Sequence, residues 1–113
     1  MTRLRVRKPS DSNRTAPHWG EIWMAESLPF DDGIHAKGRP VIIKSRDGDT
    51  FLCFKCTSQE SSFRERYRVL DLEEAGLDRY SFIDYEPIRV PRVKLSRKLG
   101  TMSEEDLAGF GRL

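Results

Sequence analysis

Long apolar segments are missing from this sequence of 113 residues. No apolar run approaches the roughly 20 residues that a membrane-spanning helix requires. The N-terminus also lacks the apolar core that a secretory signal needs. We therefore expect a cytoplasmic protein that has no membrane partner.

Cysteine and histidine are scarce, with two residues of each. Cys53 and Cys56 are three positions apart within an apparent strand, and this spacing points their side chains to opposite faces. They therefore suit neither a disulfide nor shared zinc ligation, because structural zinc normally takes four ligands. His18 and His35 lie far apart in sequence and are poor substitutes. We expect two free thiols, no metal site and no cofactor.

The charge is small but unevenly distributed. The composition is 37% hydrophobic and 34% charged, which is ordinary for one soluble domain. Residues 1–17 carry five basic residues against one acidic residue, so the net +2 of the chain leaves −2 for residues 18–113. We interpret residues 1–17 as a basic, disordered arm and residues 18–113 as a single domain. The arm could attract nucleic acid or could be a solvated tail.

The central stretch of the chain predicts a β-hairpin. Val41–Ile43 is a β-branched run, and Phe51–Phe54 is a second apolar run. Asp47–Gly48 between them supplies the positive φ that a tight hairpin turn needs.

This hairpin would place Arg39 and Thr57 at the same open end, because one residue precedes its first strand and the other follows its second. Arginine offers five donors in a planar fork, and the hydroxyl of threonine adds another polar group. The pair could therefore grip a phosphate. The alternative is that Arg39 is a solvated residue at a strand start and Thr57 is a turn residue.

Further elements are expected along the rest of the chain. They are strands over His18–Ala25, Tyr67–Leu72 and Tyr80–Glu86, with Ile88–Val90 continuing the extended run beyond Pro87, a loop over Pro29–Gly38, a helical turn before Gly76 and a C-terminal helix capped by Ser103. Pro87 marks a sheet edge or a bulge, where the neighbouring Glu86 can be re-aimed toward a cleft. About six short strands and one terminal helix predict a mainly β fold, in the form of a small, curled β-barrel.

The terminal helix has a clear start signal. Ser103 and Asp106 form an acidic variant of the capping box, and Met102 and Leu107 are spaced as a hydrophobic staple. Gly109 and Gly111 then weaken the continuation, so the helix should be short.

Several other polar residues are candidates for nucleic-acid contact. His35 could act as an acid or base near neutral pH, although a lone loop histidine is commonly just solvated. Arg64 lies beside Phe63 and Arg66, and a basic–aromatic cluster of this kind can hold single-stranded nucleic acid by charge and stacking. The same cluster is also what an exposed loop pinned by one apolar residue looks like.

Taken together, these segments resemble the MazF/PemK family of toxin ribonucleases from bacterial toxin–antitoxin pairs. The segments that carry the resemblance are Gly20–Trp23, Gly38–Ile43, Cys56–Ser58, Gly76–Leu77, Ser81 five residues before Glu86, and Leu99–Ser103. The resemblance implies an SH3-like β-barrel, a homodimer and metal-independent cleavage of single-stranded RNA. It also implies an antitoxin protein that wraps the dimer and blocks the RNA groove.

By this resemblance Arg39, Thr57 and Glu86 would be the catalytic residues. The expected RNA-binding residues are His35, Lys55, Ser58, Gln59 and Arg64. The sequence departs from the family pattern, since Pro87 replaces a common glutamine and Asp84 replaces an arginine that some members use. His35 also differs in its spacing to Arg39 from the loop histidine of some members, and the basic arm of 17 residues is not typical of the family.

Metal-free RNA cleavage needs a deprotonated 2′-hydroxyl, a neutralised phosphorane charge and a protonated 5′-oxygen. Arg39 can neutralise the charge on the phosphorane, Thr57 can orient the phosphate, and Glu86 or His35 could move protons.

Two other functions are open. A barrel of this kind can instead bind a protein target, as gyrase-poisoning toxins do, because a fold does not settle function. It can also bind RNA without cleaving it, a reading that Pro87 and Asp84 favour.

Overall fold

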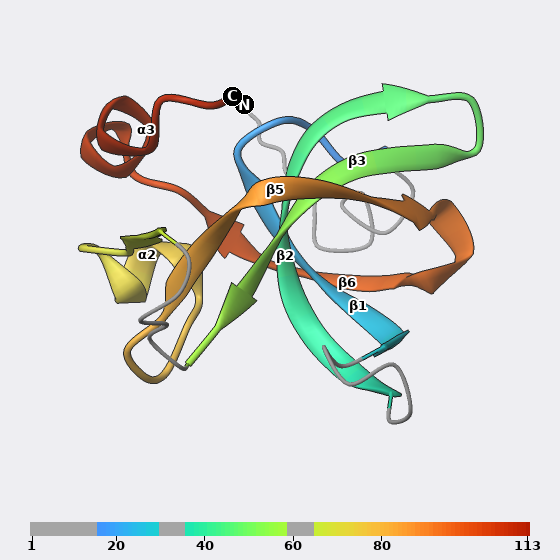
Figure 1. The fold of residues 1–113 in the computed structure, drawn as a ribbon, viewed down its shortest axis with the longest axis horizontal. Helices are drawn as coiled ribbons and strands as arrows, with labels where there is room; N and C mark the ends of the chain where they lie inside the picture. Colours follow the sequence, from blue (N-terminus) through green and yellow to red (C-terminus); the bar gives the residue numbers. More distant parts are fainter. Residues whose placement is uncertain (1–15, 30–35, 59–64) are drawn as a thin grey trace, which may run out of the picture.

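The computed structural model describes residues 16–29, 36–58 and 65–113. Within these ranges, six strands form one antiparallel sheet in the order β4-β5-β3-β2-β1-β6 (Figure 1). The strands are β1 (Glu21–Pro29), β2 (Ala36–Asp47), β3 (Thr50–Thr57), β4 (Arg66–Arg68), β5 (Phe82–Pro91) and β6 (Leu95–Thr101). The helices are α2 (Leu72–Ala75), the 3-10 helix η1 (Arg92–Lys94) and α3 (Glu104–Phe110).

The sheet is strongly curled, as the length of the η1 connection requires. η1 joins β5 to β6 with three residues, although three other strands lie between them in the sheet. In a flat sheet, four strand spacings would separate β5 from β6 by about 19 Å. A 3-10 helix rises only about 2 Å per residue, so the sheet must bend to bring the two strands together. Figure 1 shows β5 and β6 meeting at the right of the view, opposite α2 and α3.

The predicted mainly β class with a short C-terminal helix is therefore confirmed. The ladders among the described residues leave β4 and β6 at the two ends of the strand order, so the sheet is curled but open. Closure into a barrel stays a prediction.

Each face of the sheet carries its own core cluster. The cluster on what we call the Val41 face consists of Trp23, Ala25, Val41, Ile43, Phe51, Cys53, Val90 and Leu95. The cluster on the Ile42 face consists of Ile22, Ile42, Phe54, Cys56, Val69, Ala75, Ile83, Met102 and Phe110, with α2 and α3 supplying part of it. Because both faces are covered, the run Val41–Ile43 is buried throughout instead of alternating with polar residues.

The hairpin of β2 and β3 has the predicted turn. The strands flank Gly48, which has a φ of +65° and so occupies the left-handed region that glycine adopts without strain. Cys53 and Cys56 of β3 are free thiols on opposite faces of the sheet, as the spacing predicted.

Asp106 anchors α3 to the body of the protein. Its backbone N–H donates to Ser103 Oγ at 3.0 Å, which confirms the predicted cap. Its carboxylate accepts from Tyr67 Oη at 2.7 Å and from the backbone N–H groups of Leu70 and Asp71 at 2.9 and 3.0 Å. Burial alone would raise the pKa of Asp106, but these hydrogen bonds outweigh burial and hold the pKa below its ordinary value.

Phe110 at the end of α3 fixes the helix on the Ile42 face. Its ring packs edge-on against Phe54 with centroids 4.9 Å apart, and it stacks on Tyr85 at 5.0 Å. Gly111 ends the helix in the left-handed conformation, so α3 spans only seven residues, as expected.

The expected strand over Tyr67–Leu72 is wrong in its extent. β4 ends at Arg68, and α2 begins at Leu72. The cause is local capping, because the side chain of Asp71 accepts from the backbone N–H of Glu74 at 3.0 Å. The helical turn that was expected before Gly76 is present, with Gly76 as its left-handed cap.

The extended run through Pro87 forms one continuous strand, β5, as expected, whereas the strand Leu95–Thr101 was not predicted. Among the described residues, β4 pairs with β5 only as far as Asp84, so none of them pairs with the outer side of β5 at Pro87, a position where proline is tolerated. The register against β3 shifts between Phe54 and Cys56, which confirms the predicted bulge beside Pro87.

Two other expectations concern chain segments rather than strands. The loop expected over Pro29–Gly38 is shorter, because Pro29 belongs to β1 and Ala36 already begins β2. Most of the expected basic arm, residues 1–15, lies outside the described residues. Pro17 is buried, so the packed part of the chain begins before His18.

Candidate active site

Arg39 and Thr57 lie at the same end of the β2–β3 hairpin. Val41 pairs with Lys55, and the same register continued by two residues brings Arg39 opposite Thr57. Strand alternation from Val41 and Lys55 places both side chains on the Val41 face. The predicted position of the two residues at one hairpin end agrees with this register, whereas a contact between their side chains and a catalytic role stay predictions.

Arg39 also lies close enough to Cys56 of β3 for its charge to act on that thiol. Burial raises the pKa of the Cys56 thiol to about 12, and the positive charge of Arg39 opposes that rise. Cys56 directly precedes Thr57 in the chain. Arg39 is a half-buried residue, and its Nε atom is enclosed by protein. A charge in such a setting is less screened than one in bulk water.

The bulge in β5 adds two carboxylates to the same face. Phe54 pairs with Pro87 and Cys56 pairs with Ile83. The single residue between them on β3, Lys55, therefore faces the three residues 84–86 of β5. Tyr85 stacks on Phe110 and so points to the Ile42 face. Its neighbours Asp84 and Glu86 therefore point to the Val41 face, where Asp84 is buried and Glu86 is exposed.

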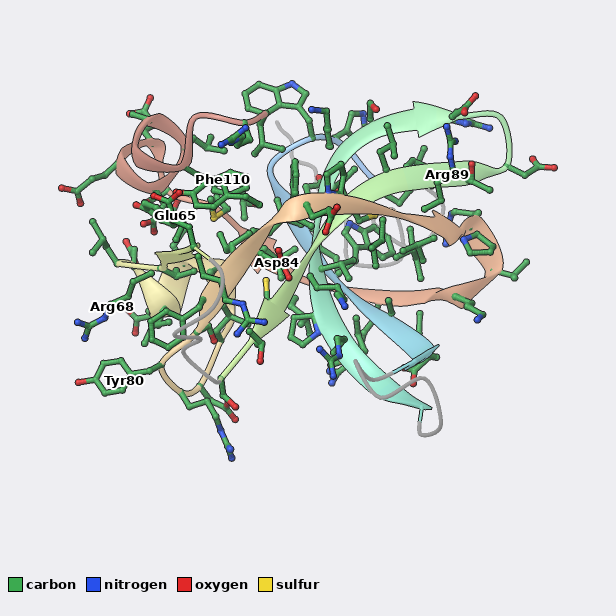
Figure 2. The ribbon with its side chains drawn as sticks, viewed as in Figure 1. Glu65, Arg68, Tyr80, Asp84, Arg89 and Phe110 are labelled. Carbon is green, nitrogen blue, oxygen red and sulfur yellow. The ribbon has the colours of Figure 1, made fainter. Side chains whose placement is uncertain are left out.

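Asp84 is held by contacts on two sides. Its Oδ1 accepts from the backbone N–H of Glu86 at 3.2 Å, and its Oδ2 lies 3.9 Å from Nη2 of Arg66, the residue paired with it in β4. Both side chains are largely buried. Figure 2 shows Asp84 near the middle of the molecule, where β5 crosses the strands behind it. A carboxylate fixed in this way can orient neighbouring cations.

Sequence reasoning missed the pairing of Asp84 with Arg66. In the sequence, Asp84 is interpreted as the replacement for an arginine and Arg66 as part of a basic–aromatic cluster, with no connection drawn between the two residues. A signal was available, since Ile83 and Tyr85 flank Asp84 and alternation would have placed the acid on the face opposite to theirs. The partner on β4 could not be read from the sequence, because it depends on the register between two strands.

The remaining predicted site residues divide into two groups. Lys55 is half-buried in β3, and Ser58 is exposed directly after that strand. His35, Gln59 and Arg64 lie outside the described residues. Glu86 and His35 are the two expected proton-transfer groups. The structure describes Glu86, which is exposed at the rim of the site, whereas His35 is outside the described residues.

The arrangement gathers three basic residues, two acids and one hydroxyl along one end of the Val41 face. They are Arg39, Lys55, Arg66, Asp84, Glu86 and Thr57. Such a set can bind an anion through the cations and can move protons through an exposed carboxylate. Within residues 16–29, 36–58 and 65–113, histidine, cysteine, aspartate and glutamate form no group of three or more suited to a metal ion.

Comparison with known proteins does not assign the chain to a family. No protein-family model matches the sequence, and no curated protein matches it either. The MazF/PemK resemblance is therefore carried by the motifs alone and stays a prediction. Among the described residues, no helix has the length and apolar character that crossing a membrane requires.

Proposed function

We propose that this protein is an endoribonuclease that cleaves single-stranded RNA without a metal ion and acts as the toxin of a toxin–antitoxin pair. The observation that carries the proposal is the placement of Arg39 and Thr57 at one end and on one face of the β2–β3 hairpin. A guanidinium beside a hydroxyl is a suitable pair for a phosphodiester, because the first supplies charge and the second supplies a directed hydrogen bond.

In this proposal the RNA supplies its own nucleophile. The 2′-oxygen attacks the phosphorus while a base removes its proton, and the bond from phosphorus to the 5′-oxygen breaks as that oxygen gains a proton. The products are a 2′,3′-cyclic phosphate and a 5′-hydroxyl. Arg39 stabilises the charge that grows on the non-bridging oxygens, Thr57 orients the phosphate, and Glu86 exchanges protons.

Two partners belong to the proposal besides RNA. A second copy of the chain would form a homodimer, and an antitoxin protein would cover the RNA-binding face. Both follow from the family resemblance in the sequence motifs, and the proposal also includes action in the cytoplasm.

RNA binding without cleavage is a second candidate function, and the Asp84–Arg66 pair favours it. The acid stands where some members of the resembled family have an arginine, and its carboxylate lies beside one of the site's cations. This pairing lowers the positive charge available to a phosphorane relative to a site built from arginines alone.

The decisive experiment incubates the purified protein with a long, unstructured RNA in EDTA. The ribonuclease proposal expects discrete fragments that end in 2′,3′-cyclic phosphates, and no cleavage of a DNA strand of the same sequence, because DNA lacks the 2′-hydroxyl. Intact RNA that nevertheless binds the protein in a salt-dependent way would favour the second candidate.

A further inference from the structure

Tyr80 and Arg68 form an exposed pair at the β4 edge of the sheet. Tyr80 is 64% exposed, a large fraction for an aromatic side chain. The guanidinium carbon of Arg68 lies over its ring, 4.7 Å from the centroid. Figure 2 shows both side chains pointing away from the body of the molecule near α2. An exposed aromatic ring held by an arginine is preorganised for a ligand, because the ring's orientation is already restricted.

The strand register links this pair to the candidate active site. Thr57 pairs with Phe82, and Phe82 pairs with Arg68, so the three residues form one row across β3, β5 and β4. Residues directly opposite one another share a face, so Arg68 projects from the same face as Thr57. Two strand spacings correspond to about 10 Å, a distance that one bound RNA strand can cover while it contacts both positions.

The chemistry of the pair suits an unpaired base. One face of the Tyr80 ring is covered by the guanidinium, and the high exposure of the residue leaves ring surface open to solvent. Unpaired bases stack on aromatic rings and on guanidinium planes, and this stacking tolerates any base because every base has a π-face. The charge of Arg68 also attracts the phosphate backbone.

We propose that Tyr80 and Arg68 form a stacking subsite for an unpaired base of the single-stranded RNA whose phosphate is held at Arg39 and Thr57. This inference rests on the proposed function, which it extends by defining where the strand continues beyond the scissile phosphate. Because stacking does not read base edges, the subsite contributes affinity rather than sequence preference.

Binding of an uncleavable 2′-O-methyl RNA dodecamer of mixed sequence, measured by fluorescence anisotropy, tests the subsite without requiring cleavage. We expect Tyr80→Ala to raise the dissociation constant about tenfold, because one base–aromatic stack is lost. Tyr80→Phe keeps the ring and should bind within about twofold of the wild type. Leu70→Ala is the matched control, because Leu70 is also a large exposed residue, 58% exposed, on the segment after β4.

A second readout reports stacking itself. With 2-aminopurine placed at successive positions of the dodecamer, one position should lose fluorescence on binding to the wild type and to Tyr80→Phe, and should stay bright with Tyr80→Ala. Equal affinity and equal quenching for wild type and Tyr80→Ala would overturn the subsite, even in a protein that cleaves RNA. Binding that depends on Tyr80 in a protein that never cleaves RNA would support the subsite and reject the nuclease. A wild type that binds no RNA would overturn both.

Discussion

The Arg66 guanidinium lies 3.9 Å from the carboxylate of Asp84, and the two side chains are only 11% and 6% exposed. This nearly buried ion pair joins β4 to β5 beside the residues proposed to bind RNA. Its position makes it a structural support for the candidate site, since β4 carries both Arg66 and Arg68.

Removing one partner of this pair should be costly. Asp84→Ala leaves the Arg66 charge nearly buried without its carboxylate, so we expect a loss of about 3 kcal/mol in the free energy of unfolding, measured by urea denaturation. Arg89→Ala is the control, because the Arg89–Asp47 pair is 61% and 62% exposed and Arg89 lies on β5, outside the hairpin turn. Its loss should stay below about 1 kcal/mol. Equal losses in the free energy of unfolding would show that the Asp84–Arg66 pair stabilises the protein no more than an exposed ion pair does.

Asp106 should make the stability of the protein depend on pH. Its folded-state pKa is lowered, so the unfolded chain takes up the proton first as the pH falls. The stabilisation by its carboxylate is therefore complete above about pH 4, the unfolded pKa, and is lost as the pH falls through the folded pKa. Asp106→Asn should cost about 2 kcal/mol at pH 7.

Urea unfolding at pH 7 and at pH 3 checks this prediction. The difference between wild type and Asp106→Asn should shrink at the lower pH, because at about pH 3 the Asp106 carboxyl of the unfolded chain is largely protonated and part of the stabilisation is lost. Glu104→Gln serves as a control on the same helix, because Glu104 is exposed. A difference between wild type and Asp106→Asn that does not change with pH would contradict the assigned role.

The two thiols should be unreactive in the folded protein. Burial raises the pKa of both Cys53 and Cys56 to about 12. At pH 8 about one thiol in ten thousand is then the reactive thiolate. Iodoacetamide should label neither cysteine in the native state and both in urea, as measured by mass spectrometry. Rapid native labelling at pH 8 would contradict the burial of these residues.

The hairpin and the terminal helix could be predicted from sequence because their signals are local. Asp47–Gly48 specifies the turn, and Ser103 with Asp106 specifies the helix start. β6 was missed because Arg97 and Lys98 are exposed on an edge strand, so its pattern has little apolar character. Its place in the sheet depends on pairing with β1, which is distant in sequence.

In the candidate site, too, local relationships could be predicted from the sequence and contacts between distant strands could not. Arg39 and Thr57 could be placed together because one hairpin carries both. The Asp84–Arg66 pair could not be predicted, because it needs the register between β4 and β5 and the bulge that turns residues 84–86. The expected strand over Tyr67–Leu72 failed because the cap on α2 at Asp71 overrides the strand-like alternation.

The hydroxyl of Thr57 should contribute directly to RNA cleavage. Thr57→Val keeps the shape of the side chain and removes the group that would contact the phosphate. We expect kcat/KM for RNA cleavage to fall about 10- to 100-fold, the effect of losing one hydrogen bond to a charged group. Thr101→Val is the control, because Thr101 is a half-buried threonine on β6. Comparable losses in the two variants would remove Thr57 from the mechanism.

The most direct test of the account is the rate of RNA cleavage in EDTA by Arg39→Ala, compared with the wild type and with Arg97→Ala. Arg97 is an exposed arginine on β6, at the other end of the strand order from β4. Loss of one donor that stabilises a transition-state charge is typically worth about 3 to 4 kcal/mol, so Arg39→Ala should be at least about a hundredfold slower. Arg39→Lys, which keeps the charge without the planar fork, covers the case in which Arg39→Ala fails to fold, and it should also be slow. Arg97→Ala should match the wild type. Full cleavage by a folded Arg39→Ala or Arg39→Lys protein would contradict the central claim.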